Sequence, residues 1–157
     1  MRARLAVAGE LERGYVAPPP TVAGDAEQLR GVFANLVANA FEAVAAAGSV
    51  GRVALRVFRA PARPEDRVLR VGARDPLPDP ARREAVVEVS DTGPGVPPEL
   101  RERVFYPFFT TKETGAGIGL ALAHKAVVAH GGAVEVAEAP GGGATFRVRL
   151  PLQEAAA

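Results

Sequence analysis

Hydrophobic residues recur with helical spacing in the stretch that follows Asp25. Gly48 ends the pattern, whose apolar members stand three or four positions apart: Leu29, Val32, Phe33, Leu36, Val37, Ala40 and Val44. Asp25 and Gln28 have the spacing of a capping box, in which two side chains satisfy backbone N–H groups at a helix start. The pattern predicts a long amphipathic helix over about 26–46.

Alternating apolar and polar residues predict strands on both sides of this helix. In the last of them, Phe146, Val148 and Leu150 are expected to face the core, and Arg147 and Arg149 the solvent. The stretches with a strand pattern are 3–7, 10–16, 53–57, 86–89, 133–138 and 145–150. We expect the two strands that follow the helix next in the chain, 53–57 and 86–89, to sit in one sheet.

A second helix is predicted over 117–129, because Gly131 and Gly132 end its apolar pattern. Residues 59–84 are rich in Pro, Arg and Asp and are interpreted as an exposed insertion with room for one extra strand. Strands separated by helices, with a hairpin at the end, favour an α+β domain with two layers over a doubly wound fold.

Composition narrows the classes of protein. The 157 residues suffice for one cored domain, 1–157, and are too few for two full ones. A net charge of +1 gives no reason to expect nucleic acid or direct membrane contact as the main task. The chain lacks cysteine and a membrane-length apolar stretch, and its two histidines cannot build a zinc centre alone. We expect a cytoplasmic, soluble fragment.

Asn35, Asn39 and Glu42 form a polar stripe along the first predicted helix, since positions i, i+4 and i+7 share one side. Amide oxygens are hard ligands, and Mg²⁺ that bridges nucleotide phosphates needs only one or two protein oxygens. Asn39 suits that role. The alternative is that these side chains are simply solvated helix surface.

Asp91, Gly93 and Gly95 directly follow an apolar strand. A buried carboxylate there, beside glycines that allow close approach, accepts a hydrogen bond from an exocyclic amine and so selects adenine over guanine. The same residues are also compatible with an ordinary turn.

A third cluster combines aromatic residues at 105–109 with Lys112 and three glycines that precede the second helix. Gly115, Gly117 and Gly119 let backbone amides converge on phosphate at a helix N-terminus, and Lys112 adds a positive charge. The spacing is neither that of a Walker loop nor that of a Rossmann fingerprint. The aromatic residues are equally compatible with core packing.

Taken together, NLVANAFEA at 35–43, DTGPGVP at 91–97, FYPFFTTK at 105–112 and GAGIGLA at 115–121 resemble the N, G1, F and G2 boxes of sensor histidine kinases, in the same order. The similarity covers about 25–151, and this stretch resembles the catalytic, ATP-binding domain of sensor histidine kinases of the nitrogen-regulation type. These kinases belong to the same superfamily as gyrase and MutL. The resemblance implies a two-layer α/β sandwich: a mixed, mostly antiparallel sheet of about five strands, covered on one face by about three helices.

The resemblance also assigns roles. Asp91 would bind the adenine amine, with Gly93 and Gly95 shaping that pocket, and Asn39, helped by Asn35, would hold Mg²⁺. The remaining residues implied in ATP binding are Thr110, Thr111, Lys112, Gly115, Gly117, Gly119 and Leu120, with Lys112 counted as catalytic beside the two asparagines. No adenine-site hydroxyl is carried over to Thr145, because Ala144 stands where the family often has Thr.

Related ATPases carry a water-activating Glu at the position of Asn35, and an amide is no general base. The resemblance therefore implies phosphoryl transfer from ATP to a histidine. His124 and His130 are expected to be packing or capping residues, so the acceptor is expected on a separate dimerisation domain, with a response regulator downstream. We expect the lid, 106–116, to be ordered by nucleotide. A serine-directed anti-sigma-type kinase and a non-catalytic ATP-dependent interaction module remain alternatives.

Overall fold

A six-stranded sheet forms one layer of the molecule. The computed structural model describes residues 3–5, 9–48, 50–62, 83–109 and 117–153. The strands lie in the order β1 (Ala3–Leu5), β2 (Gly9–Tyr15), β3 (Gly51–Pro61), β4 (Arg83–Asp91), β6 (Ala144–Pro151) and β5 (Ala133–Glu138). Within this sheet β2 and β3 run parallel, and every other pair is antiparallel. The predicted mixed sheet is confirmed, with one strand more than the expected five.

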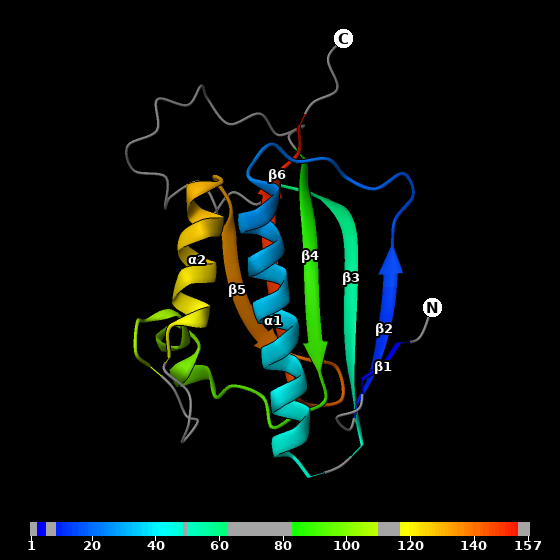
Figure 1. Cartoon of the computed structure of the whole chain (residues 1–157), viewed down its shortest axis with the longest axis vertical. Coiled ribbons are helices and arrows are strands. Elements are labelled where there is room, and N and C mark those ends of the chain that lie inside the picture. The colour runs from blue at the N-terminus through cyan, green and yellow to red at the C-terminus, as the bar shows by residue number, and fades with distance from the viewer. Residues whose placement is uncertain (1–2, 6–8, 49, 63–82, 110–116, 154–157) are drawn as a thin grey trace.

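Two α-helices, α1 (Ala26–Ala46) and α2 (Gly119–Ala129), lie on the same face of the sheet (Figure 1). Two short 3-10 helices, η2 (Pro98–Leu100) and η3 (Arg103–Phe105), complete the helices of the described residues, where about three were expected. The bounds of α1 confirm the prediction. α2 starts two residues later than predicted, because Gly117 has a positive φ of 69°.

The start of α1 differs in one respect from a capping box. The Asp25 carboxylate accepts hydrogen bonds from the backbone N–H groups of Glu27 (2.9 Å) and Gln28 (3.1 Å), as expected for an N-cap. The Gln28 side chain, however, donates to the Asp25 carboxylate. The backbone N–H of Asp25 donates instead to His130 Nε2 at 3.0 Å, so a residue beyond α2 completes the cap of α1.

The core lies between α1 and the central strands. Leu36 and Val44 of α1 are 1% exposed, and fully burying one such side chain contributes roughly 1.5–3 kcal/mol. The buried residues that face them from the sheet are Val53, Val87, Val89, Phe146, Val148 and Leu150. The inward orientation predicted for the last three is confirmed.

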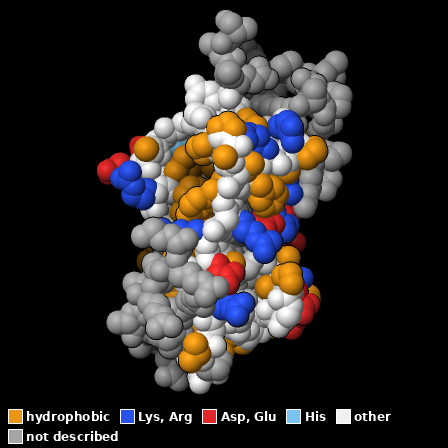
Figure 2. All heavy atoms as spheres, turned by 90° about the vertical axis from the view of Figure 1, so that its right-hand side faces the viewer, with side chains coloured by type: hydrophobic (Ala, Val, Ile, Leu, Met, Phe, Trp, Pro, Cys, Tyr) orange, Lys and Arg blue, Asp and Glu red, His pale blue; other side chains and the backbone are white. Residues whose placement is uncertain are grey.

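The helices leave part of this face without a helix over it. In Figure 1, β2 and β3 extend to the right of α1, and no helix lies in front of them. Seen from that side, hydrophobic side chains gather in a hollow in the upper half of the molecule (Figure 2). This surface is distinct from the one between α1 and α2.

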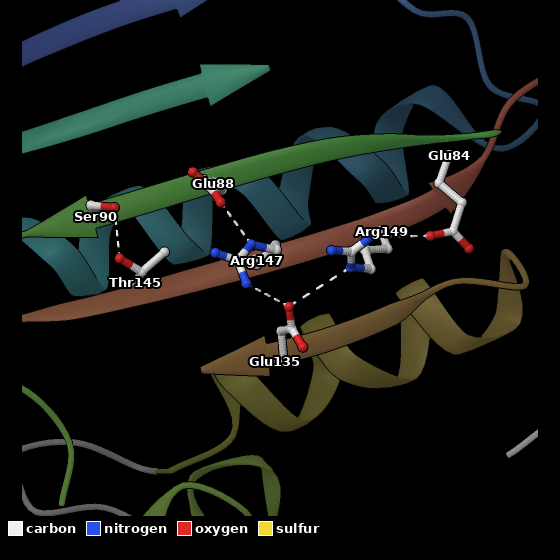
Figure 3. Close-up of polar contacts among 7 residues, drawn as sticks. All are labelled: Glu84, Glu88, Ser90, Glu135, Thr145, Arg147 and Arg149. Atoms are coloured by element: carbon white, nitrogen blue, oxygen red, sulfur yellow. Dashed lines mark hydrogen bonds and ion pairs between the residues drawn. The ribbon is translucent and has the colours of Figure 1, made fainter. Parts of the chain in front are cut away.

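A ladder of ion pairs crosses the other face of the sheet (Figure 3). Arg147 bonds Glu88 of β4 and Glu135 of β5, both at 2.7 Å, and Arg149 Nη1 lies 3.4 Å from Glu84 Oε2. Arg149 was predicted to face solvent, but it is only 6% exposed. Alternation identified its face correctly; it could not reveal that this part of the face is buried and supplies carboxylate partners.

The predicted insertion, 59–84, is shorter than expected at both ends. β3 continues to Pro61 and β4 starts at Arg83, and these two residues are partners in the antiparallel ladder. Residues 63–82, and the extra strand considered there, lie outside the described residues. Among the described helices, none is long and apolar enough to cross a lipid bilayer.

Candidate nucleotide site

Asp91 ends β4 with its side chain buried, 4% exposed. Its Oδ1 accepts hydrogen bonds from the backbone N–H groups of Gly93 (2.9 Å) and Ala144 (3.2 Å). Burial raises the pKa of this carboxyl above its ordinary value, although the two hydrogen bonds act in the opposite direction. Among the described residues, none donates a hydrogen bond to Oδ2. Asp91 is therefore held through Oδ1 alone, and Oδ2 is left as an acceptor.

Glycines let three backbone segments close around Asp91. A Cβ on Gly93 would lie 2.8 Å from the Ala43 carbonyl of α1, closer than real Cβ contacts allow. A Cβ on Gly143 would overlap the Asp91 carbonyl oxygen, and its φ of 89° also disfavours a side chain. Gly95, with a φ of 78°, lies against Gly143. Sequence reasoning singled out Gly93 and Gly95 but missed Gly143, whose signal was the run of three glycines before β6.

Thr92 fastens the loop that follows Asp91. Its backbone N–H donates to the Arg52 carbonyl (3.1 Å), and its Oγ1 accepts from the Arg52 N–H (2.9 Å). This reciprocal pair ties the loop to the start of β3. Thr145 has a different role, because its hydroxyl bonds Ser90 at 2.8 Å on the far face of the sheet (Figure 3). Leaving Thr145 out of the predicted adenine site is therefore consistent with its position.

Asn35 and Asn39 lie together on the side of α1 that faces α2. Asn39 Nδ2 donates to Asn35 Oδ1 at 3.2 Å, which orients both half-buried amides. A Cβ on Gly119 would overlap the Asn35 amide, so the first turn of α2 lies directly against this pair. Glu42, the third member of the predicted stripe, is exposed.

The donor set beside α1 fits a magnesium ion only if a nucleotide shares the coordination. In the described ranges, no group of three or more His, Cys, Asp or Glu side chains could hold a metal. An amide oxygen is a hard, neutral ligand of the kind that Mg²⁺ accepts, with phosphate oxygens and water completing its octahedron. In Asn39 the amide oxygen is the atom of this ligand type, because the amide nitrogen is a donor, here to Asn35.

A cavity of about 290 Å³ opens between the two helices beside the asparagine pair. Its lining comes from both helices: Gln28, Gly31, Val32, Asn35, Gly119, Leu122, Ala123 and Ala126. The N-terminus of α2, which has no side-chain cap, borders this space. Uncapped N–H groups at a helix N-terminus favour bound anions such as phosphate.

The first residues of the predicted lid, as far as Phe109, are joined to the segment at the start of α2. Phe108 N–H donates to the Gly117 carbonyl at 2.8 Å, and a Cβ on Gly117 would lie 2.5 Å from the Phe108 carbonyl carbon. Phe108 has a φ of 66°, a conformation that strains a bulky residue. Leu120 packs against the core, so its predicted role at the nucleotide is not evident from its contacts. Thr110, Thr111, Lys112 and Gly115 lie outside the described residues, with most of the predicted lid.

Both histidines have structural partners. The His124 ring lies 5.4 Å from the ring of Phe105, which also meets Phe146 edge-on at 6.2 Å. His130 Nε2 accepts from the Asp25 N–H, and its Nδ1 lies 2.6 Å from the Ala126 carbonyl. These contacts agree with the prediction of packing and capping roles.

Comparison with known proteins identifies the family. The profile described as "Histidine kinase-, DNA gyrase B-, and HSP90-like ATPase" matches residues 24–154. The chain therefore belongs to this family of ATP-binding ATPase domains, and the α+β sandwich and the resemblance to sensor histidine kinases are confirmed.

The relatives are more specific. The chain is 42% identical over 134 residues to the sensory histidine kinase/phosphatase NtrB of Rhodobacter capsulatus, covering 85% of the chain and 34% of that protein. It is 33% identical to NtrB of Escherichia coli O157:H7, over 92% of the chain and 37% of the relative. The catalytic domain of histidine kinase ThkA superimposes with a TM-score of 0.68 at 27% identity, covering 92% of this chain and 80% of that one. The chain spans about a third of the length of the curated relatives that it matches.

Proposed function

We propose that this domain binds Mg-ATP and transfers the γ-phosphoryl group to a histidine on a separate dimerisation domain, as the catalytic part of a sensor kinase in two-component signalling. The observation that carries the proposal is the buried Asp91, which keeps Oδ2 as an acceptor while two backbone N–H groups hold Oδ1. A cytoplasmic location follows from this proposal, since ATP is the substrate.

Asp91 would recognise the base. An ionised carboxylate accepts hydrogen bonds and donates none, so Oδ2 pairs with the adenine amine and rejects the carbonyl oxygen that guanine presents there. Gly93, Gly95 and Gly143 let backbone segments pack closely around the carboxylate and so fix its position, because a Cβ at each would crowd neighbouring backbone atoms.

The asparagine pair and the first turn of α2 would hold the phosphates. N–H groups at the α2 N-terminus attract anionic oxygens, and Gly119 keeps that turn close to Asn35. Asn39, supported by Asn35, would bind Mg²⁺, which neutralises phosphate charge when bound. We assign further phosphate contacts to Thr110, Thr111, Lys112 and Gly115 on the basis of the motif alone.

Asn35 favours transfer over hydrolysis. Its amide cannot take a proton from water, so a nucleophile that needs no such base has the advantage. The lone pair of a neutral imidazole nitrogen attacks the γ-phosphorus, and the bond from that phosphorus to the bridging oxygen breaks. ADP leaves with the electron pair on its β-phosphate oxygen, and the phosphorylated ring then loses the proton on its other nitrogen to solvent. His124 and His130 are engaged in packing and capping, which favours an acceptor outside the chain.

Exposed apolar residues beside the phosphate end would receive the acceptor domain. Phe108 is 76% exposed and Leu122 60%, and Tyr106 and Ile118 are exposed near them in sequence. Phe108 combines a positive φ with a backbone hydrogen bond to Gly117, and its ring is exposed to solvent. A response regulator would then take the phosphoryl group from the histidine.

The test is a chimera in which this chain replaces the matched third of Rhodobacter capsulatus NtrB. With γ-labelled ATP and Mg²⁺, we expect label on the NtrB portion that is lost in acid and retained in base. Native NtrB is the positive control, and the chimera carrying Asp91→Asn is the matched negative control. Acid-stable label would support a serine-directed kinase, whereas nucleotide binding without any label would support an interaction module; either result contradicts the proposal.

A further inference from the structure

The α1 helix has an apolar flank that points away from the nucleotide site. Phe33, Val37 and Phe41 follow one another at intervals of four and are half-buried at the edge of the core. At 100° per residue, Val37 stands on roughly the opposite side of the helix from Asn39. The same helix therefore carries the predicted magnesium ligand on one flank and an incompletely covered apolar strip on the other.

Strands β2 and β3 continue this strip. Leu55 and Val57 lie on the face of β3 that packs against the core, and the register places Tyr15 of β2 beside Val57. Tyr15 is 58% exposed. We refer to Phe33, Val37, Leu55, Val57 and Tyr15 as the α1/β3 surface. In Figure 1 no helix covers β2 and β3, and Figure 2 shows the hydrophobic hollow on this side of the molecule.

The charges around the α1/β3 surface are mainly positive. Arg13, the neighbour of Leu55 in the ladder, is exposed, and Arg59 follows Val57 on the same face of β3. Arg30 is exposed on α1 and is offset by Glu27 alone among the described residues, at 3.8 Å between two highly exposed side chains. The three arginines outnumber this one glutamate, so the rim formed by these residues has a net positive charge.

The geometry limits how a partner can bind. β3 is paired on both sides, with β2 and β4, so a partner cannot reach Leu55 and Val57 by adding a strand beside them. It must instead place apolar side chains on the surface from above. A helix beside α1 does this with residues at i, i+3 or i+4, and i+7.

We propose that the α1/β3 surface docks an amphipathic helix of another protein, with an apolar stripe toward Tyr15 and Val57 and Asp or Glu residues along its borders. The acidic borders would meet Arg13, Arg30 and Arg59. This site is separate from the exposed residues around Phe108 and does not depend on phosphoryl transfer.

Two synthetic helical peptides of 18 residues test the charge and the place together. Both carry the same Leu stripe and one Trp, which gives a fluorescence signal without background because the chain contains no Trp. One has Glu on its borders and the other Lys. We expect the Glu peptide to bind at least about tenfold more tightly, and Arg13→Glu to remove most of that preference.

The matched variants locate the binding. Tyr15→Ala should weaken the Glu peptide about tenfold, since a central aromatic residue often dominates such a contact. Val128→Ala changes a comparably exposed residue, 52%, on α2 and should leave binding unchanged. ATP-analogue affinity, measured in parallel, shows that each variant is folded.

Three results of the peptide titrations would overturn the proposal. They are equal binding of the two peptides, unchanged binding after Tyr15→Ala, and an effect of Val128→Ala as large as that of Tyr15→Ala. Concentration-dependent dimerisation of the chain that Tyr15→Ala abolishes would assign the surface to a second copy of the chain and would likewise contradict it.

Discussion

Replacing Asp91 by Asn keeps the shape of the side chain and changes one of its two hydrogen-bond acceptors into a donor. The backbone N–H groups of Gly93 and Ala144 both donate to Oδ1, and an amide oxygen can still accept them. The position of Oδ2 becomes an NH₂ donor that faces the donor amine of adenine. The substitution therefore acts on the nucleotide contact and leaves the scaffold in place.

The expected loss of nucleotide-binding free energy follows from this change of one acceptor into a donor. A hydrogen bond to a charged group contributes about 1.5–3 kcal/mol, and a buried donor left without an acceptor costs about 1–3 kcal/mol. We expect a combined loss of about 3 kcal/mol, which corresponds to about a 100-fold weaker Kd. Calorimetric titration of a non-hydrolysable ATP analogue, with Mg²⁺ present, measures it.

The thermal stability of the nucleotide-free Asp91→Asn variant should rise, although its nucleotide affinity falls. Burial raises the pKa of Asp91, so stability associated with this group is present at low pH and is lost as pH rises through its folded pKa. Asn carries no charge to bury. At pH 7 the free Asp91→Asn variant should melt at a higher temperature than the wild type, and the difference should shrink as pH falls toward 3.8, the ordinary value of the carboxyl. Unchanged analogue binding, or a parallel fall in melting temperature and affinity, would refute the reasoning.

Three further substitutions test other parts of the site. Gly143→Ala should lower the free energy of unfolding, measured in thermal melts, by at least about 2 kcal/mol and abolish nucleotide binding. The control Gly142→Ala has a similar φ but open space around it, so it should cost only about 1 kcal/mol. Equal costs for the two variants would contradict the packing argument. Asn39→Ala should weaken analogue binding about tenfold with Mg²⁺ and leave it unchanged in EDTA, so an equal loss in both titrations would exclude a ligand role. His130→Ala removes both hydrogen bonds of the ring and should cost about 1–3 kcal/mol in urea unfolding, against less than about 0.5 kcal/mol for the exposed Lys125→Ala; similar losses would show that the ring adds nothing.

Local signals explain which elements could be predicted. α1 is set by an apolar stripe, an N-cap at Asp25 and a glycine after its end, all within one short stretch of sequence, and its predicted bounds are the observed ones. Arg149 shows the limit of such reasoning. Its partner Glu84 lies 65 residues away, so its burial depends on the pairing of β4 with β6, which alternation along one strand does not contain.

The nucleotide site also combines residues that the sequence reveals with contacts that only the folded structure reveals. Asp91 and the asparagines stand in compact motifs whose chemistry is visible in the sequence. The donor at Ala144 is a backbone N–H, 53 residues from Asp91, and no residue type marks it. Gly143 could be interpreted as part of a hairpin turn, but its close approach to the Asp91 carbonyl requires the folded sheet.

The use of backbone donors at Asp91 has a consequence for how this family can diverge. Since the peptide N–H of residue 144 holds the carboxylate, any side chain at that position that fits the buried space preserves the contact. A residue with a hydroxyl group can therefore stand in place of Ala144 in related proteins without loss of this hydrogen bond. Gly143 does not tolerate substitution in the same way, because a Cβ there would overlap the Asp91 carbonyl oxygen. Mutational tolerance should change abruptly between two adjacent codons, and a search for relatives that weights residue 143 above residue 144 should recover more distant members.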